Sequence, residues 1–199
     1  MKTKINVKSL FLALKGERKT RDADKVVVAL GVESTALCKS VNVPCPLYPV
    51  KGHLVTVSSK HDFGYNISLH GGVGYAAPMA NIDSEGRRLY RLSGFVDFTT
   101  EKETNHDRVE ALLDAARVDL PDLEMIDSSA CHRPVSADDR PLIGPSRKYS
   151  NLFLCAGFGS RGWSIGLGCG KLLASQILGM ECDIDPGPYL PCRFDWSTR

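Results

Sequence analysis

The sequence lacks the patterns that mark several large classes of protein. Its 199 residues contain no apolar run near the roughly 18 residues of a membrane-spanning helix, and the lysine-rich start has no apolar core of a secretory signal. The net charge is only +2, which gives no reason to expect nucleic acid or an anionic membrane as a partner. We therefore expect a globular, cytoplasmic chain whose partners must be inferred from its sites.

Cysteine patterns of the zinc-binding or disulfide type are also missing. The chain has seven cysteines, an odd number, and none of them form a Cys-x-x-Cys pair. The sequence therefore predicts neither a metal site nor a disulfide framework. Cys155 in an apolar strand and Cys169 on a helix of small residues are expected to be buried, reduced thiols that pack as small hydrophobes.

The most informative glycines gather near the end of the sequence. An apolar strand precedes Gly157, Gly159 and Gly162, whose spacing is that of a dinucleotide-binding turn that opens a helix. In such a fold a further strand and an acidic ribose ligand should follow about 20 residues later. Glu181 and Asp183 lie at that distance, but their segment is turn-like and rich in proline and glycine. The glycines are therefore expected to contact something other than a nucleotide.

Four segments of the chain carry further motifs. They are Lys25-Val-Val-Val-Ala-Leu-Gly31, Pro46-Leu-Tyr-Pro-Val-Lys-Gly-His53, Arg133-Pro-Val-Ser-Ala-Asp-Asp-Arg-Pro-Leu-Ile-Gly144 and Gly157-Phe-Gly-Ser-Arg-Gly-Trp163. In their order and intervals they resemble the FAD-dependent D-amino-acid dehydrogenases of the D-amino-acid oxidase-like superfamily. The resemblance extends from about residue 15 to residue 194. Members of that family open with a Gly-x-Gly-x-x-Gly turn, and because none lies upstream of Lys25, the chain resembles the second half of a flavoenzyme.

The resemblance implies a fold of mixed α/β and α+β class. A partial FAD-binding, Rossmann-like domain would comprise residues 1–46 and 132–199, and an inserted antiparallel-sheet substrate-binding domain would comprise residues 47–131. Residue patterns give the expected elements. These are a hairpin within 11–24, a strand at 25–30 buried on both faces of a parallel sheet, strands at 53–58, 89–98 and 124–131, a helix at 105–118 capped by Asn105 or Asp107, and a final helix from Gly162.

The resemblance also implies which residues form the site. The turn Gly157–Ser164 would aim its N–H groups and helix dipole at the pyrimidine side of the FAD isoalloxazine. Arg133 matches the arginine that binds the substrate carboxylate, a task suited to its planar and permanently charged guanidinium. Tyr75 and Phe95 would line the substrate pocket. The implied cofactor-binding residues are Ala29, Gly31, Lys51, Gly157, Gly159, Ser160, Arg161, Gly162, Trp163 and Ser164.

Several of these residues have a plainer structural alternative. Arg133 could form a surface salt bridge, and Tyr75 could be an ordinary core residue, as could Phe95. Lys51 and His53 could be solvated side chains of a polar loop.

Four further residues are expected to be structural. Gly166 and Gly170 follow Gly162 at intervals of four residues, so they could serve only to pack the final helix closely on a sheet. Asp138 and Asp139 are expected to fix the turn before a proline. His commonly stands in this family where the chain has Phe158, which removes a polar contact from that position.

The activity implied by the resemblance is oxidative deamination of a small D-amino acid. The α-hydrogen would pass as hydride to FAD, and the imino acid would hydrolyse to a 2-oxo acid and ammonia, with a quinone or another acceptor reoxidising the flavin. A related glycine, sarcosine or D-amino-acid oxidase is one alternative. A truncated, non-catalytic binding or regulatory chain is another, with a complementing chain or a second copy as its partner.

Overall fold

The computed structural model describes residues 12–14, 17–19 and 23–194, which form two compact units. The first unit comprises the described residues up to Tyr48 and from Arg133 onward, and the second comprises Pro49–His132. The chain passes between them within strands β4 (Leu47–Ser59) and β8 (Glu124–Ser136). Each unit has its own hydrophobic core.

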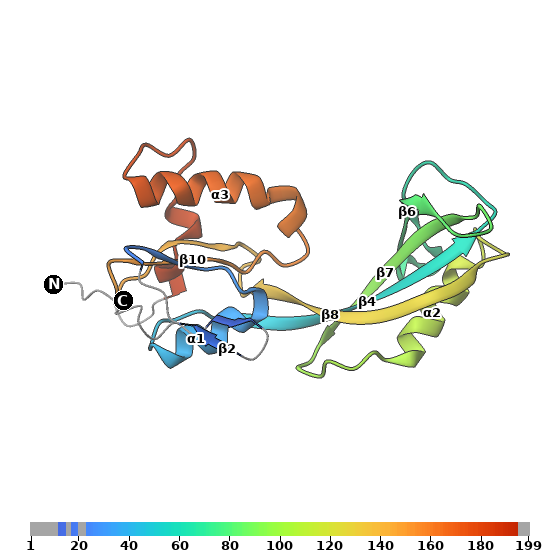
Figure 1. Cartoon of the computed structure of the whole chain (residues 1–199), viewed down its shortest axis with the longest axis horizontal. Helices are drawn as coiled ribbons and strands as arrows, with labels where there is room; N and C mark the ends of the chain where they lie inside the picture. The colour runs from blue at the N-terminus through green and yellow to red at the C-terminus, as the bar shows by residue number, and fades with distance from the viewer. Residues whose placement is uncertain (1–11, 15–16, 20–22, 195–199) are drawn as a thin grey trace. The chain divides into compact units, whose positions relative to one another are not determined.

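A three-stranded sheet with helices on both faces forms the centre of the first unit (Figure 1). Its strand order is β3 (Val26–Val28), β10 (Leu152–Ala156), β9 (Leu142–Pro145), and β10 pairs parallel with β3 and antiparallel with β9. Helix α1 (Ser34–Ser40) covers one face and helix α3 (Gly162–Leu178) covers the other. The uninterrupted apolar sequence of β10 suits this burial on both faces.

The edge strand β3 is buried on one face only, contrary to the expectation from its sequence. Val26 and Val28 are buried in the core beneath α1, whereas 42% of Val27 is exposed. Helix α3 places Leu172 and Leu173 over β9 and β10, and in the described part of the chain nothing buries Val27. The apolar run correctly predicts a parallel strand, but a neighbouring element on its second face cannot be inferred from the strand alone.

The second unit is a five-stranded antiparallel sheet with one helix. The strand order is β5 (Ile67–Ser68), β6 (Gly74–Ile82), β7 (Arg88–Phe98), β4, β8. Helix α2 (His106–Ala116) packs on one face, where the core residues are Val55, Val57, Leu69, Ala76, Tyr90, Leu92, Val109, Leu112, Leu113, Ala115, Ala116 and Leu120. The side chain of Asn105 accepts a hydrogen bond of 2.9 Å from the Asp107 N–H, which confirms the predicted cap.

Short elements complete the two units. Strands β1 (Leu12–Leu14) and β2 (Glu17–Lys19) pair antiparallel, in agreement with the expected hairpin. The 3-10 helices are η2 (Gly31–Glu33), η3 (His70–Gly72), η4 (Gly187–Tyr189) and η5 (Pro191–Phe194). Strand β4 begins six residues before the expected start, and β8 continues to Ser136. The predicted fold class, mixed α/β with an antiparallel sheet, is confirmed.

Candidate functional site

The turn between β10 and α3 depends on its glycines. Gly157 and Gly159 have φ angles of 81° and 57°, a left-handed conformation that side chains with a Cβ rarely adopt. A Cβ on Gly157 would also lie 2.8 Å from Cδ2 of Leu47. The chain therefore follows this path only because these positions lack side chains.

The first turn of α3 has no side-chain cap. Arg161 occupies the N-cap position, and its side chain makes no capping hydrogen bond. Within the described residues, the backbone N–H groups of Ser160, Gly162 and Trp163 make no hydrogen bond. The positive end of the helix dipole and three N–H donors are thus available to an electron-rich group.

Two parallel strands bring the predicted cofactor-binding segments to the same edge of the first sheet. Ala29 and Gly31 follow the carboxyl end of β3, and Gly157 follows the carboxyl end of its neighbour β10. Gly31 has a φ of 58° and begins the turn into α1, where the Leu30 N–H donates to Oγ of Ser34 over 3.1 Å. In open sheets with parallel strands, ligands bind outside this edge.

The strand that carries Arg133 is hydrogen-bonded to the same turn. The Gly159 N–H donates to the Pro134 carbonyl over 2.8 Å, and Val135 pairs antiparallel with Phe158. Arg133 itself is half-buried. The structure therefore brings Arg133 and the glycine turn together, although the two segments are more than 20 residues apart in sequence.

Ion pairs fix the loop between β8 and β9, which is joined by one of them to the glycine turn. Arg193 contacts both carboxylate oxygens of Asp138, at 2.8 and 2.9 Å, and lowers the pKa of that carboxyl to about 2. The Arg140 N–H also donates to Asp138. Nη2 of Arg161 lies 2.8 Å from Oδ2 of Asp139. Both aspartates thus fix the turn as predicted, and Arg161 uses part of its guanidinium to bind the protein itself.

Lys51 and His53 are buried, so the expectation that they are solvated is wrong. They lie inside β4 and not in a loop, and their exposed fractions are 4% and 0%. Nζ of Lys51 donates to the Glu103 carbonyl over 3.1 Å, and Nε2 of His53 accepts from the Asn105 N–H over 3.2 Å. The segment before α2 therefore covers both side chains, and Lys51 stays only a prediction as a cofactor ligand.

The two aromatic residues predicted near the substrate differ in their surroundings. Tyr75 on β6 is 63% exposed, so it is not a core residue. Phe95 is half-buried with a φ of 64°, and the Arg108 guanidinium lies 4.4 Å from its ring centre. A positive φ at a non-glycine residue costs energy and is common at functional positions.

Other expectations concern α3 and the thiols near it. A Cβ on Gly166 or Gly170 would meet no described atom within 4 Å, so close packing of these glycines on the sheet is not observed. The face of α3 that packs on the sheet carries Leu172 and Leu173 instead. Cys155 and Cys169 are free thiols as expected, but they are half-buried and not fully buried, and this partial burial raises the pKa of each.

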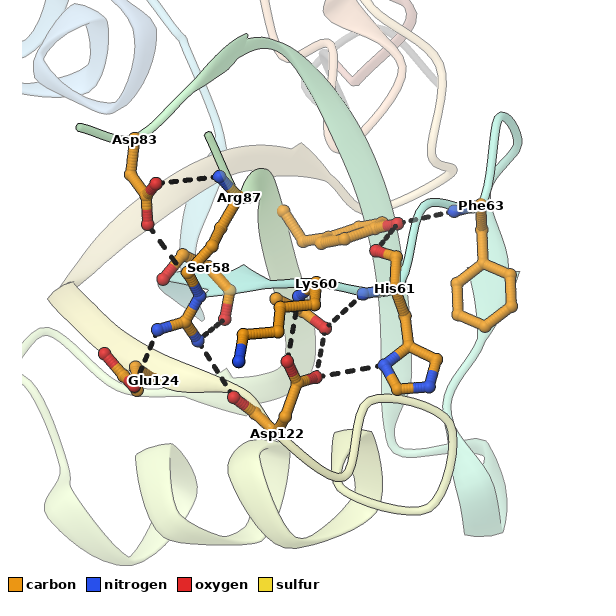
Figure 2. A network of polar contacts seen from close by, with 10 residues as sticks. Ser58, Lys60, His61, Phe63, Asp83, Arg87, Asp122 and Glu124 are labelled. Atoms are coloured by element: carbon orange, nitrogen blue, oxygen red, sulfur yellow. Dashed lines mark hydrogen bonds and ion pairs between the residues drawn. The ribbon is translucent and has the colours of Figure 1, made fainter. Parts of the chain in front are cut away.

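The sequence gives no sign of a polar network in the second unit (Figure 2). Asp122 accepts hydrogen bonds from the Ser59 hydroxyl, at 2.5 Å, and from the Lys60 N–H, at 2.9 Å. Nδ1 of His61 lies 3.0 Å from the same carboxylate. These contacts, led by the Ser59 hydroxyl, lower the pKa of Asp122.

Arg87 continues this network toward β8. It is 5% exposed, and Nη1 lies 2.6 Å from Oε1 of Glu124. Nη2 donates to the carbonyls of Ser58 and Asp122, at 3.2 and 2.9 Å. The network joins the end of β4, the start of β7 and the start of β8, so its role is structural.

Two other kinds of site are not observed in the ranges that the structure describes. No group of three or more His, Cys, Asp or Glu side chains is arranged to hold a metal ion. None of the described helices combines the length and the apolar character needed to span a bilayer.

Known proteins resemble both the sequence and the fold. A D-amino acid dehydrogenase from Bradyrhizobium diazoefficiens is 32% identical over 167 residues, covering 82% of this chain and 38% of the dehydrogenase. An uncharacterized oxidoreductase from Halorhodospira halophila is 32% identical over 87% of this chain and 80% of its own length. Glycine oxidase from Geobacillus kaustophilus matches the structure with a TM-score of 0.72 at 26% identity, over 86% of this chain and 46% of the oxidase.

The comparison by families agrees with these relatives. The chain spans less than half the length of the dehydrogenase and of the glycine oxidase. The FAD dependent oxidoreductase family matches residues 3–176, which is most of the sequence. The chain therefore belongs to the FAD-dependent oxidoreductase family, whose cofactor is FAD.

Proposed function

We propose that this chain supplies the flavin-contacting turn and the carboxylate-binding arginine of an enzyme that oxidatively deaminates D-amino acids. The observation that carries the proposal is the hydrogen bond from the Gly159 N–H to the Pro134 carbonyl. It joins the strand of Arg133 to the turn at the sheet edge where ligands of such folds bind. The similarity to D-amino acid dehydrogenases supports the substrate class.

The residues of the turn fit an electron-rich part of FAD. The left-handed glycines let the backbone approach a ligand closely, and the N–H groups of Ser160, Gly162 and Trp163 have no partner among the described residues. When bound, FAD would accept the α-hydrogen of the substrate as hydride. The turn would bind the flavin and favour negative charge there, because its N–H donors and the helix dipole are fixed in place.

Arg133 would hold the substrate by its carboxylate. Its guanidinium can donate two parallel hydrogen bonds and stays charged at every relevant pH. This contact would orient the α-carbon toward the flavin, so much of the rate would come from positioning. Tyr75, exposed on β6, stays a prediction as a residue that lines the substrate pocket. The proposed acceptor of the electrons is a quinone or another small oxidant.

The exposed apolar side chains of the first unit favour a second candidate function. Trp163 and Leu167 on α3 are 100% and 93% exposed, and Val27 on the edge strand β3 is 42% exposed. Such side chains in one unit are typical of a surface that another polypeptide covers. In this alternative the chain acts with a complementing chain or a second copy, and alone it binds ligands without turnover.

FAD titration of the purified chain tests the proposal. Tight, near-equimolar binding, followed by reduction of the flavin by D-alanine with a dye acceptor, is the expected result. Peroxide formation in air would instead indicate an oxidase, as in the glycine oxidase that the fold resembles. Binding without reduction favours the second candidate, and a chain that binds no FAD at any concentration overturns both.

Arg133→Ala tests the role of the arginine separately. We expect KM for D-alanine to rise roughly 100-fold, since a bidentate charged contact is lost. Arg133→Lys should recover only part of this loss. If the chain binds FAD without turnover, the shift in flavin absorbance caused by benzoate gives the same information. Arg117→Ala, at an exposed position just after α2, is the matched control.

A further inference from the structure

Arg91 on β7 has no partner for its charge among the residues that the structure describes. Its side chain is half-buried, and Nε is enclosed by protein atoms without a hydrogen-bond partner. The two Nη groups also form no hydrogen bond or ion pair in this part of the chain, and they are not enclosed. Taking a charged group partly out of water costs free energy unless another group compensates, so this guanidinium needs an explanation.

Two neighbouring arginines show what is missing at Arg91. Nη2 of Arg88 lies 2.8 Å from Oδ2 of Asp62, and Nη1 of Arg87 lies 2.6 Å from Oε1 of Glu124. Both carboxylates come from other segments of the second unit. Of these three arginines, only Arg91 lacks a carboxylate partner in the described chain. A carboxylate from outside the protein would supply the same contact.

Strand register places Arg91 on the face of the sheet opposite helix α2. The next residue, Leu92, is buried in the core beneath α2 together with Val55 and Ala76, its partners across β4 and β6. Side chains alternate between the two faces along a strand, so Arg91 and its own cross-strand partners lie on the other face. We call this the outer face of the second sheet.

Small side chains leave space beside Arg91 on the outer face. Its partners across the two ladders are Thr56 on β4 and Ala77 on β6. In the next row of the same face, Ser93 is paired with Tyr75. Arg91 and Tyr75 therefore lie on one diagonal of the ladder, roughly 7–8 Å apart, and the small residues Ala77 and Ser93 lie on the other. This arrangement leaves room for a small molecule between the guanidinium and the ring.

The chemistry of these two rows suits a carboxylate. A guanidinium binds a carboxylate through two parallel hydrogen bonds and keeps its charge. Thr56, Ser93 and Tyr75 each carry a hydroxyl group that forms no hydrogen bond within the described residues, so each can donate one to a ligand. No member of the two rows is acidic. The ring of Tyr75 is 63% exposed and offers an apolar surface to the rest of a ligand.

We propose that the outer face carries a binding site for a small organic carboxylate, formed by Arg91, Thr56, Tyr75 and Ser93. The Nη groups of Arg91 bind the carboxylate, and the apolar part of the ligand contacts the ring of Tyr75. The carboxylate must stand apart from any ammonium group, because Arg91 repels a nearby cation and no acidic side chain in the two rows offsets this repulsion. The site consists of residues of the second unit and needs no flavin, so it goes beyond the proposed function.

Nitrogen-15 NMR of the intact chain, without added FAD, tests the site directly. The Arg91→Lys variant lacks one arginine Nε–H resonance, which assigns the resonance of Arg91 in the wild type. Because this Nε is enclosed, its hydrogen should exchange slowly enough to be observed. We expect phenylacetate to shift the Arg91 resonance in a saturable way, with a Kd on the order of 1 mM. Phenylacetamide, which has nearly the same shape but no charge, should leave it in place.

Variants separate this site from Arg133. Arg91→Gln should weaken phenylacetate binding, followed by the signals of the ligand, by roughly tenfold or more, because a charged contact is lost. Arg88→Gln, in the same strand but paired with Asp62, is the matched control and should bind as the wild type does. In Arg133→Ala the Arg91 resonance should still shift.

Three results would overturn the proposal. They are an Arg91 resonance that phenylacetate does not move, an equal shift with phenylacetamide, and loss of the shift in Arg133→Ala, which would place the ligand at Arg133. Circular dichroism shows whether each variant folds, and the wild-type titration decides the matter even if one does not. None of these measurements involves the flavin, so their failure would leave the proposed function standing.

Discussion

The network around Asp122 and the turn at Gly157–Ser164 differ in whether their polar groups have hydrogen-bond partners within the protein. In the network, the Asp122 carboxylate accepts from Ser59 and Lys60, and Nη1 and Nη2 of Arg87 bind Glu124 and the Asp122 carbonyl, while Nε of Arg87 makes no hydrogen bond among the described residues. In the turn, three backbone N–H groups at the start of a helix have no partner within the described chain. Satisfied groups fit a structural role, whereas open N–H donors at the start of a helix can bind an electron-rich ligand.

The largest effect on stability is expected from Asp122→Ala. It removes the acceptor for the Ser59 hydroxyl and the Lys60 N–H and leaves the buried Arg87 with less compensating charge. We expect the free energy of unfolding to fall by roughly 2–3 kcal/mol, with FAD affinity unchanged. Urea denaturation at pH 7 measures the loss, and Asp127→Ala, exposed on β8, is the control.

Acid titration sharpens the same prediction. Because the pKa of Asp122 is lowered in the folded chain, its contribution is complete above the pKa of the unfolded chain, about 4, and is lost as the pH falls through the lowered value. The wild type should therefore lose more stability on acidification than Asp122→Ala does. Equal losses in the two proteins would show that the network contributes nothing electrostatic.

Gly157→Ala tests the glycine turn, the second of the two regions compared above. Its φ of 81° and the 2.8 Å approach of Leu47 to the added Cβ would strain the turn. We expect a loss of roughly 2 kcal/mol in stability, and in contrast with Asp122→Ala, a clear loss of FAD affinity. Fluorescence titration and urea denaturation measure the two effects. A variant that is less stable but binds FAD normally would remove the turn from the cofactor site.

Asp138→Asn tests the loop beside the turn, where the carboxylate already has a protein partner in Arg193. The Arg193 guanidinium lowers the pKa of Asp138 to about 2, so its contribution is present above about pH 4 and is lost as the pH approaches 2. The carboxylate is one-third exposed, and we expect a discounted loss of roughly 1–2 kcal/mol at pH 7. Thermal melts at pH 7 and pH 3 check this, and Asp139→Asn is the more exposed control.

The parts of the fold that the sequence predicts well are those with local signals. The cap at Asn105 and the spacing of apolar residues define α2, and the glycine spacing after β10 defines the start of α3. Strand β6 is missed because its sequence, Gly-Tyr-Ala-Ala-Pro-Met-Ala-Asn-Ile, has few β-branched residues. Its place comes from pairing with β7, which no local pattern reveals.

The same distinction applies to the candidate site, where residues in a continuous motif are predicted and residues brought together from distant segments are not. The turn and Arg133 are found because each lies in a continuous motif, and the structure adds the hydrogen bond that joins them. The Asp122 network gathers residues from three separate segments of the chain, so no local pattern in the sequence predicts it. Burial of Lys51 depends on the segment before α2, which is about 50 residues away along the chain.

The smallest expected effect, and the only gain in stability, comes from Gly166→Ala. An added Cβ would meet no described atom within 4 Å, and the position is inside α3 with no left-handed φ. Alanine is favoured over glycine in a helix by up to about 1 kcal/mol, so the melting temperature should rise by a few degrees. If FAD or a second polypeptide approaches this face closely, the same methyl group would weaken its binding. A variant that is more stable but binds FAD less tightly would therefore extend the ligand site from the turn along α3, whereas unchanged affinity would confine the site to the turn.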